Sequence, residues 1–165
     1  LSGVIQPGNI RFSQEVKIDA GKQKAFHFDK NKIKDLAIAN PKLWWPNGYG
    51  EPHLYTCDLT YTVDGKVSDT RKIRFGIREY GYEFIDDVFR IKINGKPVYI
   101  KGGNWGMSEY MLRCRGEEYD LKIKLHQEMN FNMIRNWIGS VTDEEFYDAC
   151  EIRYYGMGRF LVEFS

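Results

Sequence analysis

This sequence has little net charge, few cysteines and no long apolar run. Its 24 Lys and Arg residues nearly balance its 23 Asp and Glu residues, which leaves a formal net charge of +1. Nucleic-acid-binding proteins normally carry a clear basic surplus, so this balance argues against a nucleic-acid partner. No apolar run approaches the length that spans a bilayer. We therefore expect neither nucleic acid nor a membrane among the partners of this chain.

Reactive side chains also lack the spacings that mark catalytic or metal sites. The three cysteines Cys57, Cys114 and Cys150 are odd in number and form no CxxC pair, so neither a disulfide framework nor a metal site is indicated. His53 and His126 have no Ser, Cys or carboxylate nearby at a telling spacing, and no phosphate-binding loop is present. We expect no metal ion and no cofactor.

The start of the chain lacks an initiator methionine, and no signal peptide follows Leu1. We therefore expect the sequence to begin inside a longer protein. The cysteine usage leaves the cellular compartment open.

The first half of the chain is rich in strand patterns. Short alternating segments occur at residues 9–12, 14–18, 25–28, 54–63 and 73–77. Asp64-Gly65 lies between the last two segments and predicts a type I′ hairpin. Strands at this spacing favour an antiparallel sandwich, which usually needs about seven strands. We therefore expect one or two strands to be missing before Leu1.

A long loop at residues 40–52 interrupts these strands, and its three prolines exclude regular structure. Trp44 and Trp45 either anchor this loop to the sandwich or to a neighbouring domain, or contact a ligand directly. We favour anchoring. A second hairpin is predicted at Asn94-Gly95, and its second strand runs straight into a different pattern. The boundary between two modules is therefore expected near residues 78–83.

From residue 98 to residue 150 the sequence alternates strand, helix, strand and helix. These elements are predicted at residues 98–101, 117–129, 133–137 and from residue 142 onward. Leu121, Leu125 and Met129 form an apolar stripe that is expected to face the sheet, and either Asn130 or Asn132 is expected to end this helix in the left-handed conformation. Thr142 with Glu145 forms a capping box for the second helix, and Asp143 is also expected to cap it. A βαβα unit buries its strands between helices and presents ligand-binding groups at their carboxyl ends. This half therefore indicates the opening of an enzyme domain.

Polar and aromatic side chains gather at the ends of both predicted strands. Asn104 and Trp105 follow two glycines that permit close backbone approach, and alternation sends Arg135 and Trp137 to one side. Arg135 at the end of a buried strand needs a partner. It either forms a salt bridge that holds the sheet together, or it orients a catalytic carboxylate or a sugar hydroxyl. Trp137 either belongs to the hydrophobic core or contacts a ligand. These four residues are the candidates for substrate binding.

Six motifs in this sequence occur in the order known for one enzyme family. They are Asn40-Pro-Lys-Leu-Trp-Trp-Pro-Asn-Gly-Tyr-Gly50, Phe75-Gly-Ile-Arg-Glu79, Ile93-Asn-Gly-Lys-Pro97, Lys101-Gly-Gly-Asn-Trp105, Asn130-Phe-Asn-Met-Ile-Arg-Asn-Trp137 and Asp143-Glu-Glu-Phe-Tyr-Asp-Ala-Cys150. Through them the chain resembles glycoside hydrolase family 2, within its β-mannosidase and exo-β-glucosaminidase branch.

The resemblance implies a multidomain fragment. Residues 1–79 would be an all-β immunoglobulin-like sandwich that lacks its first strands, and residues 80–165 would be the first βα units of a TIM (β/α)8 barrel. Arg135 and Trp137 match the pair that lines the subsite for the terminal sugar. The family's acid/base and nucleophile glutamates follow later barrel strands, so we expect both to lie beyond the chain end and no catalytic residue within it.

Residues 151–165 depart from the family pattern. Codons can be chosen for this stretch whose one-nucleotide shift reads Lys-Tyr-Gly-Ile-Met-Val-Trp, which is close to the family's continuation. Our hypothesis is a frameshift near residue 150. Resequencing tests it, because an unshifted frame through residue 165 would rule it out.

Together these features predict a fragment of a retaining exo-β-glycosidase that removes terminal β-linked mannose or glucosamine from oligosaccharides, inactive by itself. The implied partners are a glycan substrate and the remaining domains of the parent enzyme, and glycan degradation slightly favours a periplasmic or secreted location. The alternative is a non-catalytic β-sandwich module that binds glycans or proteins. The strand–helix half argues against that alternative.

Overall fold

The computed structural model describes residues 1–106, 113–136, 143–151 and 161–164. The chain divides into two compact units, Leu1–Lys42 with Leu54–Ile77 and Leu43–His53 with Arg78–Ser165. The loop at residues 43–53 therefore belongs to the second unit, although the strands that flank it in sequence belong to the first.

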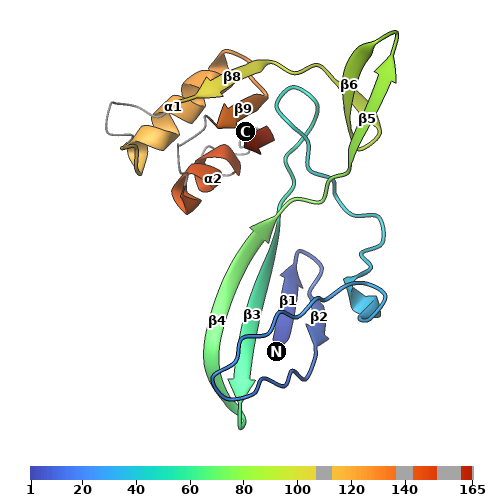
Figure 1. The fold of residues 1–165 in the computed structure, drawn as a ribbon, viewed down its shortest axis with the longest axis vertical. Coiled ribbons are helices and arrows are strands. Elements are labelled where there is room, and N and C mark those ends of the chain that lie inside the picture. The colour runs from blue at the N-terminus through green and yellow to red at the C-terminus, as the bar shows by residue number, and fades with distance from the viewer. Residues whose placement is uncertain (107–112, 137–142, 152–160, 165) are drawn as a thin grey trace. The chain divides into compact units, whose positions relative to one another are not determined.

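The first unit is one antiparallel sheet of four strands (Figure 1). Its strands are β1 (Ser2–Gln6), β2 (Ile10–Ser13), β3 (Tyr55–Val63) and β4 (Lys66–Phe75), in the order β2-β1-β3-β4, with a 3-10 turn η1 at Lys34–Leu36. The buried side chains of Ile5, Tyr55 and Cys57 form its core. The predicted hairpin is confirmed, because Asp64 and Gly65 join β3 to β4 with φ of 50° and 76°.

Two predicted strands of the first unit are wrong. Residues 14–18 and 25–28 have no regular structure, while β1, which the alternation did not reveal, pairs with both β2 and β3. Ile18 remains 46% exposed, so this alternating segment buries no continuous apolar face. Within the described residues the first unit has a single sheet, and the immunoglobulin-like sandwich stays a prediction.

The second unit begins with a small antiparallel sheet. Its strands are β5 (Tyr80–Ile85), β6 (Val88–Ile93) and β7 (Lys96–Val98), in the order β5-β6-β7. Asn94 and Gly95 form the predicted turn with φ of 51° and 77°. Asp86 and Asp87 form a second turn with φ of 52° and 59°. The pattern missed this turn because it contains no glycine.

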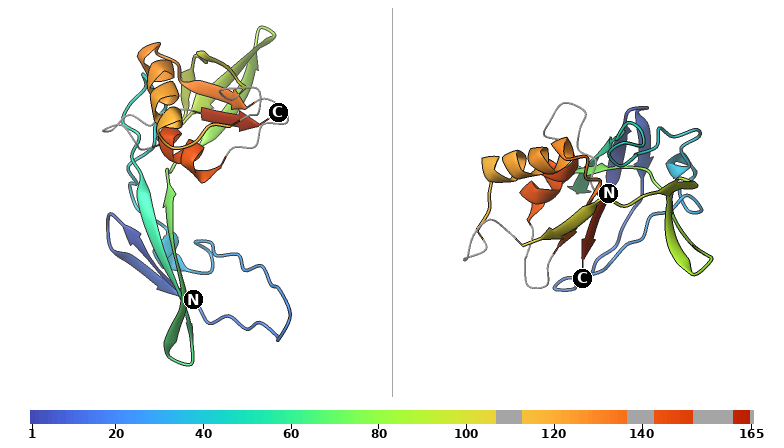
Figure 2. Two further views of the ribbon diagram at one scale, coloured as in Figure 1. Left: turned by 90° about the vertical axis from the view of Figure 1, so that its left-hand side faces the viewer. Right: turned by 90° about the horizontal axis from the view of Figure 1, so that it is seen from above.

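A parallel sheet follows, covered by two helices. Its strands are β8 (Gly102–Trp105), β9 (Met133–Asn136) and β10 (Leu161–Phe164), in the order β10-β9-β8, and the helices are α1 (Glu117–Glu128) and α2 (Glu144–Glu151). Both helices lie on one side of the sheet (Figures 1 and 2). The predicted strand–helix alternation is confirmed, but the first strand lies at 102–105 and not at 98–101, because Val98 pairs with Ile91 in the preceding sheet.

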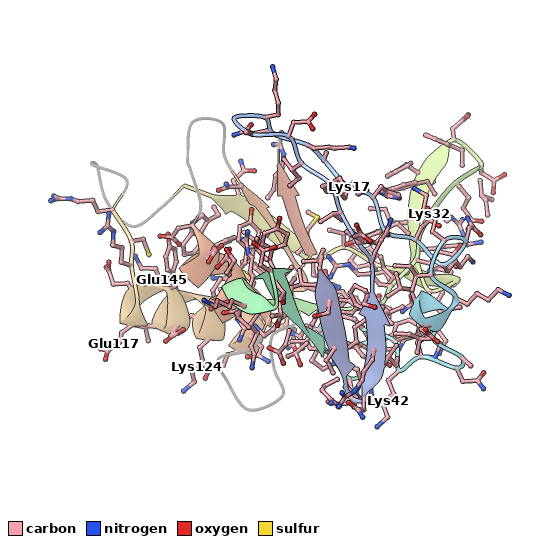
Figure 3. The ribbon with its side chains drawn as sticks, turned by 90° about the horizontal axis from the view of Figure 1, so that it is seen from below. Lys17, Lys32, Lys42, Glu117, Lys124 and Glu145 are labelled. Atoms are coloured by element: carbon pink, nitrogen blue, oxygen red, sulfur yellow. The ribbon has the colours of Figure 1, made fainter. Side chains whose placement is uncertain are left out.

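Helix α1 packs through a different face from the one that the sequence predicts. Leu121, Leu125 and Met129 are 58%, 48% and 56% exposed, whereas Tyr119 and Ile123 are buried. The Tyr119 ring packs against Trp105 of β8 and Phe146 of α2, with ring centroids 6.4 and 5.6 Å apart, so the face that carries Tyr119 and Ile123 is the one that is buried. Figure 3 shows Glu117 and Lys124 of α1 pointing away from the sheet.

The helix ends follow local chemistry. Asn130 ends α1 in the left-handed conformation with φ of 61°, as predicted. The Asp143 carboxylate accepts a hydrogen bond from the Phe146 amide at 3.1 Å and caps α2. Glu145 accepts a hydrogen bond from the Gly116 amide at 2.7 Å and so ties α2 to the start of α1. Thr142, the other half of the predicted capping box, lies outside the described residues.

Candidate sugar-binding site

Asn104 and Arg135 lie directly opposite each other on β8 and β9. The Arg135 guanidinium donates a long hydrogen bond from Nη1 to Asn104 Oδ1 at 3.5 Å, and both residues are exposed. The next pair in register, Trp105 and Asn136, is buried. Because side chains alternate along a strand, one face of this sheet packs on the helices and the other presents an amide beside a guanidinium.

Trp105 belongs to the packed face and not to the polar one. It is 5% exposed, and its ring centroid lies 5.5 Å from that of Phe146, 6.4 Å from Tyr119 and 5.7 Å from His126. The structure therefore separates Trp105 from Asn104 and Arg135, with which the sequence groups it. The fourth candidate, Trp137, lies outside the described residues.

Burial and negative charge govern the titration of Tyr119 behind the sheet. Burial, followed by the negative charge of Asp143, raises the pKa of Tyr119 from 10.0 to about 12. The phenol therefore stays neutral in the folded chain over a pH range in which it ionises after unfolding.

This raised pKa predicts a loss of stability in alkali. Above pH 10 the unfolded state binds fewer protons than the folded state, so the contribution of Tyr119 is complete below pH 10 and is lost as pH rises towards about 12. Tyr119→Phe should reduce the alkaline loss of unfolding free energy by up to about 2 kcal/mol. Urea unfolding at pH 8 to 11.5 measures it. Tyr99→Phe, at a 77% exposed tyrosine, is the control, and an equal decline in both variants would contradict the account.

The tryptophan loop at residues 43–53 is anchored within the second unit. Trp44 is fully buried, the Arg78 guanidinium lies 4.3 Å from its ring centroid, and Asn94 Nδ2 donates to its carbonyl oxygen at 2.9 Å. Lys96 Nζ lies 5.1 Å from the Trp45 ring centroid. These contacts support the anchoring role that the sequence favoured over ligand contact.

Two asparagines that bond to the main chain around β8 and β9, Asn132 and Asn47, were not predicted as important from the sequence. Asn132 is fully buried directly before β9, although the sequence suggested it only as a helix stop. A polar residue at the start of a buried strand was the available signal, since such a side chain needs hydrogen-bond partners. Asn47 donates to main-chain carbonyls near the end of α1.

Among the described residues, no group of three or more His, Cys, Asp or Glu side chains could hold a metal ion. None of the helices in the described part of the chain combines the length and apolarity that crossing a membrane requires.

Comparison with known proteins identifies the family. Residues 3–78 match the model of the glycosyl hydrolases family 2. The chain is 43% identical over 130 residues to a mannosylglycoprotein endo-β-mannosidase of Lilium longiflorum, covering 76% of the chain and 13% of the relative. It belongs to glycosyl hydrolase family 2. It is 31% identical over 141 residues to an exo-β-D-glucosaminidase of Hypocrea virens, covering 84% of the chain and 15% of the relative.

A solved family 2 structure shows the same similarity in three dimensions. The exo-chitosanase CsxA of Amycolatopsis orientalis superposes with a TM-score of 0.67 at 30% identity, over 77% of this chain and 14% of that one. The chain thus spans about a seventh of the length of the relatives it matches.

Proposed function

We propose that this family 2 chain forms part of a β-glycosidase that removes terminal β-linked mannose or glucosamine from oligosaccharides. The names of its relatives, β-mannosidases and exo-β-glucosaminidases, support the substrate class. In this proposal residues 80–165 contribute the first βα units of a (β/α)8 barrel, and the parallel pairing of β8 with β9 beside two covering helices supports that architecture. Residues 1–79 contribute the immunoglobulin-like sandwich.

The pairing of Asn104 with Arg135 is the observation that carries the proposal. A guanidinium only donates hydrogen bonds, whereas an amide both donates and accepts them. The two side chains therefore complement a sugar hydroxyl, which needs both. They stand at the carboxyl ends of adjacent parallel strands, where (β/α)8 enzymes hold their substrates.

The proposed chemistry needs two carboxyl groups. Retaining glycosidases hold an acid/base and a nucleophile about 5 Å apart, and in this proposal both belong to later strands. Asn104 and Arg135 then bind the sugar and orient it, and the isolated chain releases no p-nitrophenol from β-mannoside or β-glucosaminide substrates. Turnover by the chain alone would contradict this assignment.

Arg135→Ala is expected to weaken binding of p-nitrophenyl β-mannoside or β-glucosaminide at least tenfold, because a hydrogen bond from a charged donor contributes about 1.5–3 kcal/mol. Isothermal titration calorimetry on the full chain measures the affinity. Arg90→Ala, at an exposed arginine of β6, is the matched control and should bind as the unmodified chain does. Equal affinities for both variants would remove Arg135 from the sugar site.

A further inference from the structure

We propose that Asn132 is a positioning residue. Together with Asn47 and Tyr49, it fixes the register of β8 on β9 at the amino ends of these strands, and it thereby sets Asn104 opposite Arg135 at the carboxyl ends. The consequence for sugar binding rests on the proposed function, but the control of register does not.

The Asn132 side chain uses both of its polar atoms on the segment that leads into β8. Oδ1 accepts a hydrogen bond from the Lys101 amide at 2.9 Å, and Nδ2 donates to the Tyr99 carbonyl at 2.9 Å. The Asn132 main-chain amide donates to the Lys101 carbonyl at 2.8 Å. These three bonds lie directly before the first rung of the ladder, Gly102 with Met133. Since Asn132 is fully buried, a shifted register would leave its amide unpaired at a high cost.

The tryptophan loop holds the same two segments from outside the sheet. Asn47 Nδ2 donates to the Phe131 carbonyl at 3.0 Å, one residue before Asn132. The Tyr49 hydroxyl accepts a hydrogen bond from the Tyr99 amide at 2.7 Å. One loop, itself anchored by the buried Trp44, therefore contacts both the segment that leads into β8 and the segment that leads into β9.

The strands themselves contain little that could fix their register. β8 is only four residues long and its first two residues are Gly102 and Gly103, and glycine-rich strands specify register weakly. A slip of one residue would turn Arg135 or Asn104 towards the helix side of the sheet. The Asn132 side-chain amide has one donor and one acceptor end, so it pairs with residues 99 and 101 in one register only, which the two glycines cannot specify.

The test is NMR on the full chain with Asn132→Ala, beside Ile123→Ala as a matched core variant. Ile123 is buried in the hydrophobic cluster that includes Ile134 of β9, but its side chain takes no part in the hydrogen-bond network. Asn132→Ala should abolish the cross-strand nuclear Overhauser effects between residues 104 and 135 and accelerate exchange of the Lys101 amide at least tenfold. Ile123→Ala should keep those Overhauser effects. If Asn132→Ala also keeps them, the proposal is wrong.

Tyr49→Phe is a second test, which remains informative if Asn132→Ala does not fold. It removes one hydroxyl and should accelerate exchange of the Tyr99 amide at least fivefold, and exchange of the β8 amides more than that of the α2 amides. Unchanged exchange at Tyr99 and β8 would overturn the role of the loop. These readouts need no sugar, so a failure of sugar binding by the unmodified chain would refute the proposed function and leave the register result standing.

Discussion

Gly102→Ala is expected to destabilise the second unit by about 2–3 kcal/mol, whereas Gly103→Ala next to it should be tolerated. A Cβ built on Gly102 overlaps the carbonyl oxygen of Met133 on the neighbouring strand, while one built on Gly103 meets nothing within 4 Å. The overlapping atom is main chain, so no side-chain rotation relieves it, and overpacking of this kind costs about 1–3 kcal/mol. The lost pairing of β8 with β9 adds to that cost.

Urea unfolding followed by tryptophan fluorescence measures this difference. Gly103→Ala is the control because it changes the same residue type in the same strand, and it gains about 0.5–1 kcal/mol from reduced backbone freedom where its conformation is compatible. Equal stabilities of the two variants would show that β8 and β9 do not approach each other as closely as the structure indicates.

Trp105→Ala is expected to cost about 3–5 kcal/mol of unfolding free energy, the usual loss when a large buried aromatic side chain is removed. The ring packs against Phe146, Tyr119 and His126, so its removal leaves a cavity between β8 and both helices. Trp105→Phe should recover part of the loss because it keeps an aromatic ring in the same place.

This experiment also separates two roles for Trp105. If the ring were a sugar platform, Trp105→Ala would weaken sugar binding and leave stability nearly unchanged. Tyr82→Ala provides the control, because Tyr82 is 64% exposed and its replacement should change stability by less than about 1 kcal/mol. Equal melting behaviour for Trp105→Ala and Tyr82→Ala would contradict the packing role.

Turns and helix ends were the features that sequence reasoning predicted best, since local chemistry determines them. Asp64-Gly65 and Asn94-Gly95 adopt the positive φ that a two-residue hairpin requires. Asn130 and Asp143 end and begin their helices by means of their own side chains or backbone conformations. None of these features depends on distant parts of the chain.

The face of α1 and the start of β8 could not be predicted in the same way, because both depend on tertiary packing. The stripe through Leu121 has the right period, but the buried face of α1 is the one that carries Tyr119 and Ile123. Residues 99–101 have strand-like composition, yet their main-chain amides and carbonyls are bonded to Tyr49 and Asn132.

Tertiary packing also limits how much of the candidate site could be predicted. Arg135 and Asn104 follow from the rule that ligand groups stand at the carboxyl ends of parallel strands. Trp105 looks equivalent to Asn104 when the strand is expected to end at residue 101. Once β8 includes residues 102–105, alternation sends Asn104 and Trp105 to opposite faces.

In the proposed function the exposed pair of Asn104 and Arg135 binds the terminal sugar. A protein-observed NMR titration of the full chain with methyl β-mannoside and glucosamine tests it most directly. We predict saturable shifts of the Asn104 side-chain amide and of Arg135 Nε–H in the unmodified chain. The Asn104 shift should be lost in Arg135→Ala, and both shifts should be unaltered in Arg90→Ala. Shifts confined to the first unit, or no shift at these two side chains at saturating sugar, would contradict it.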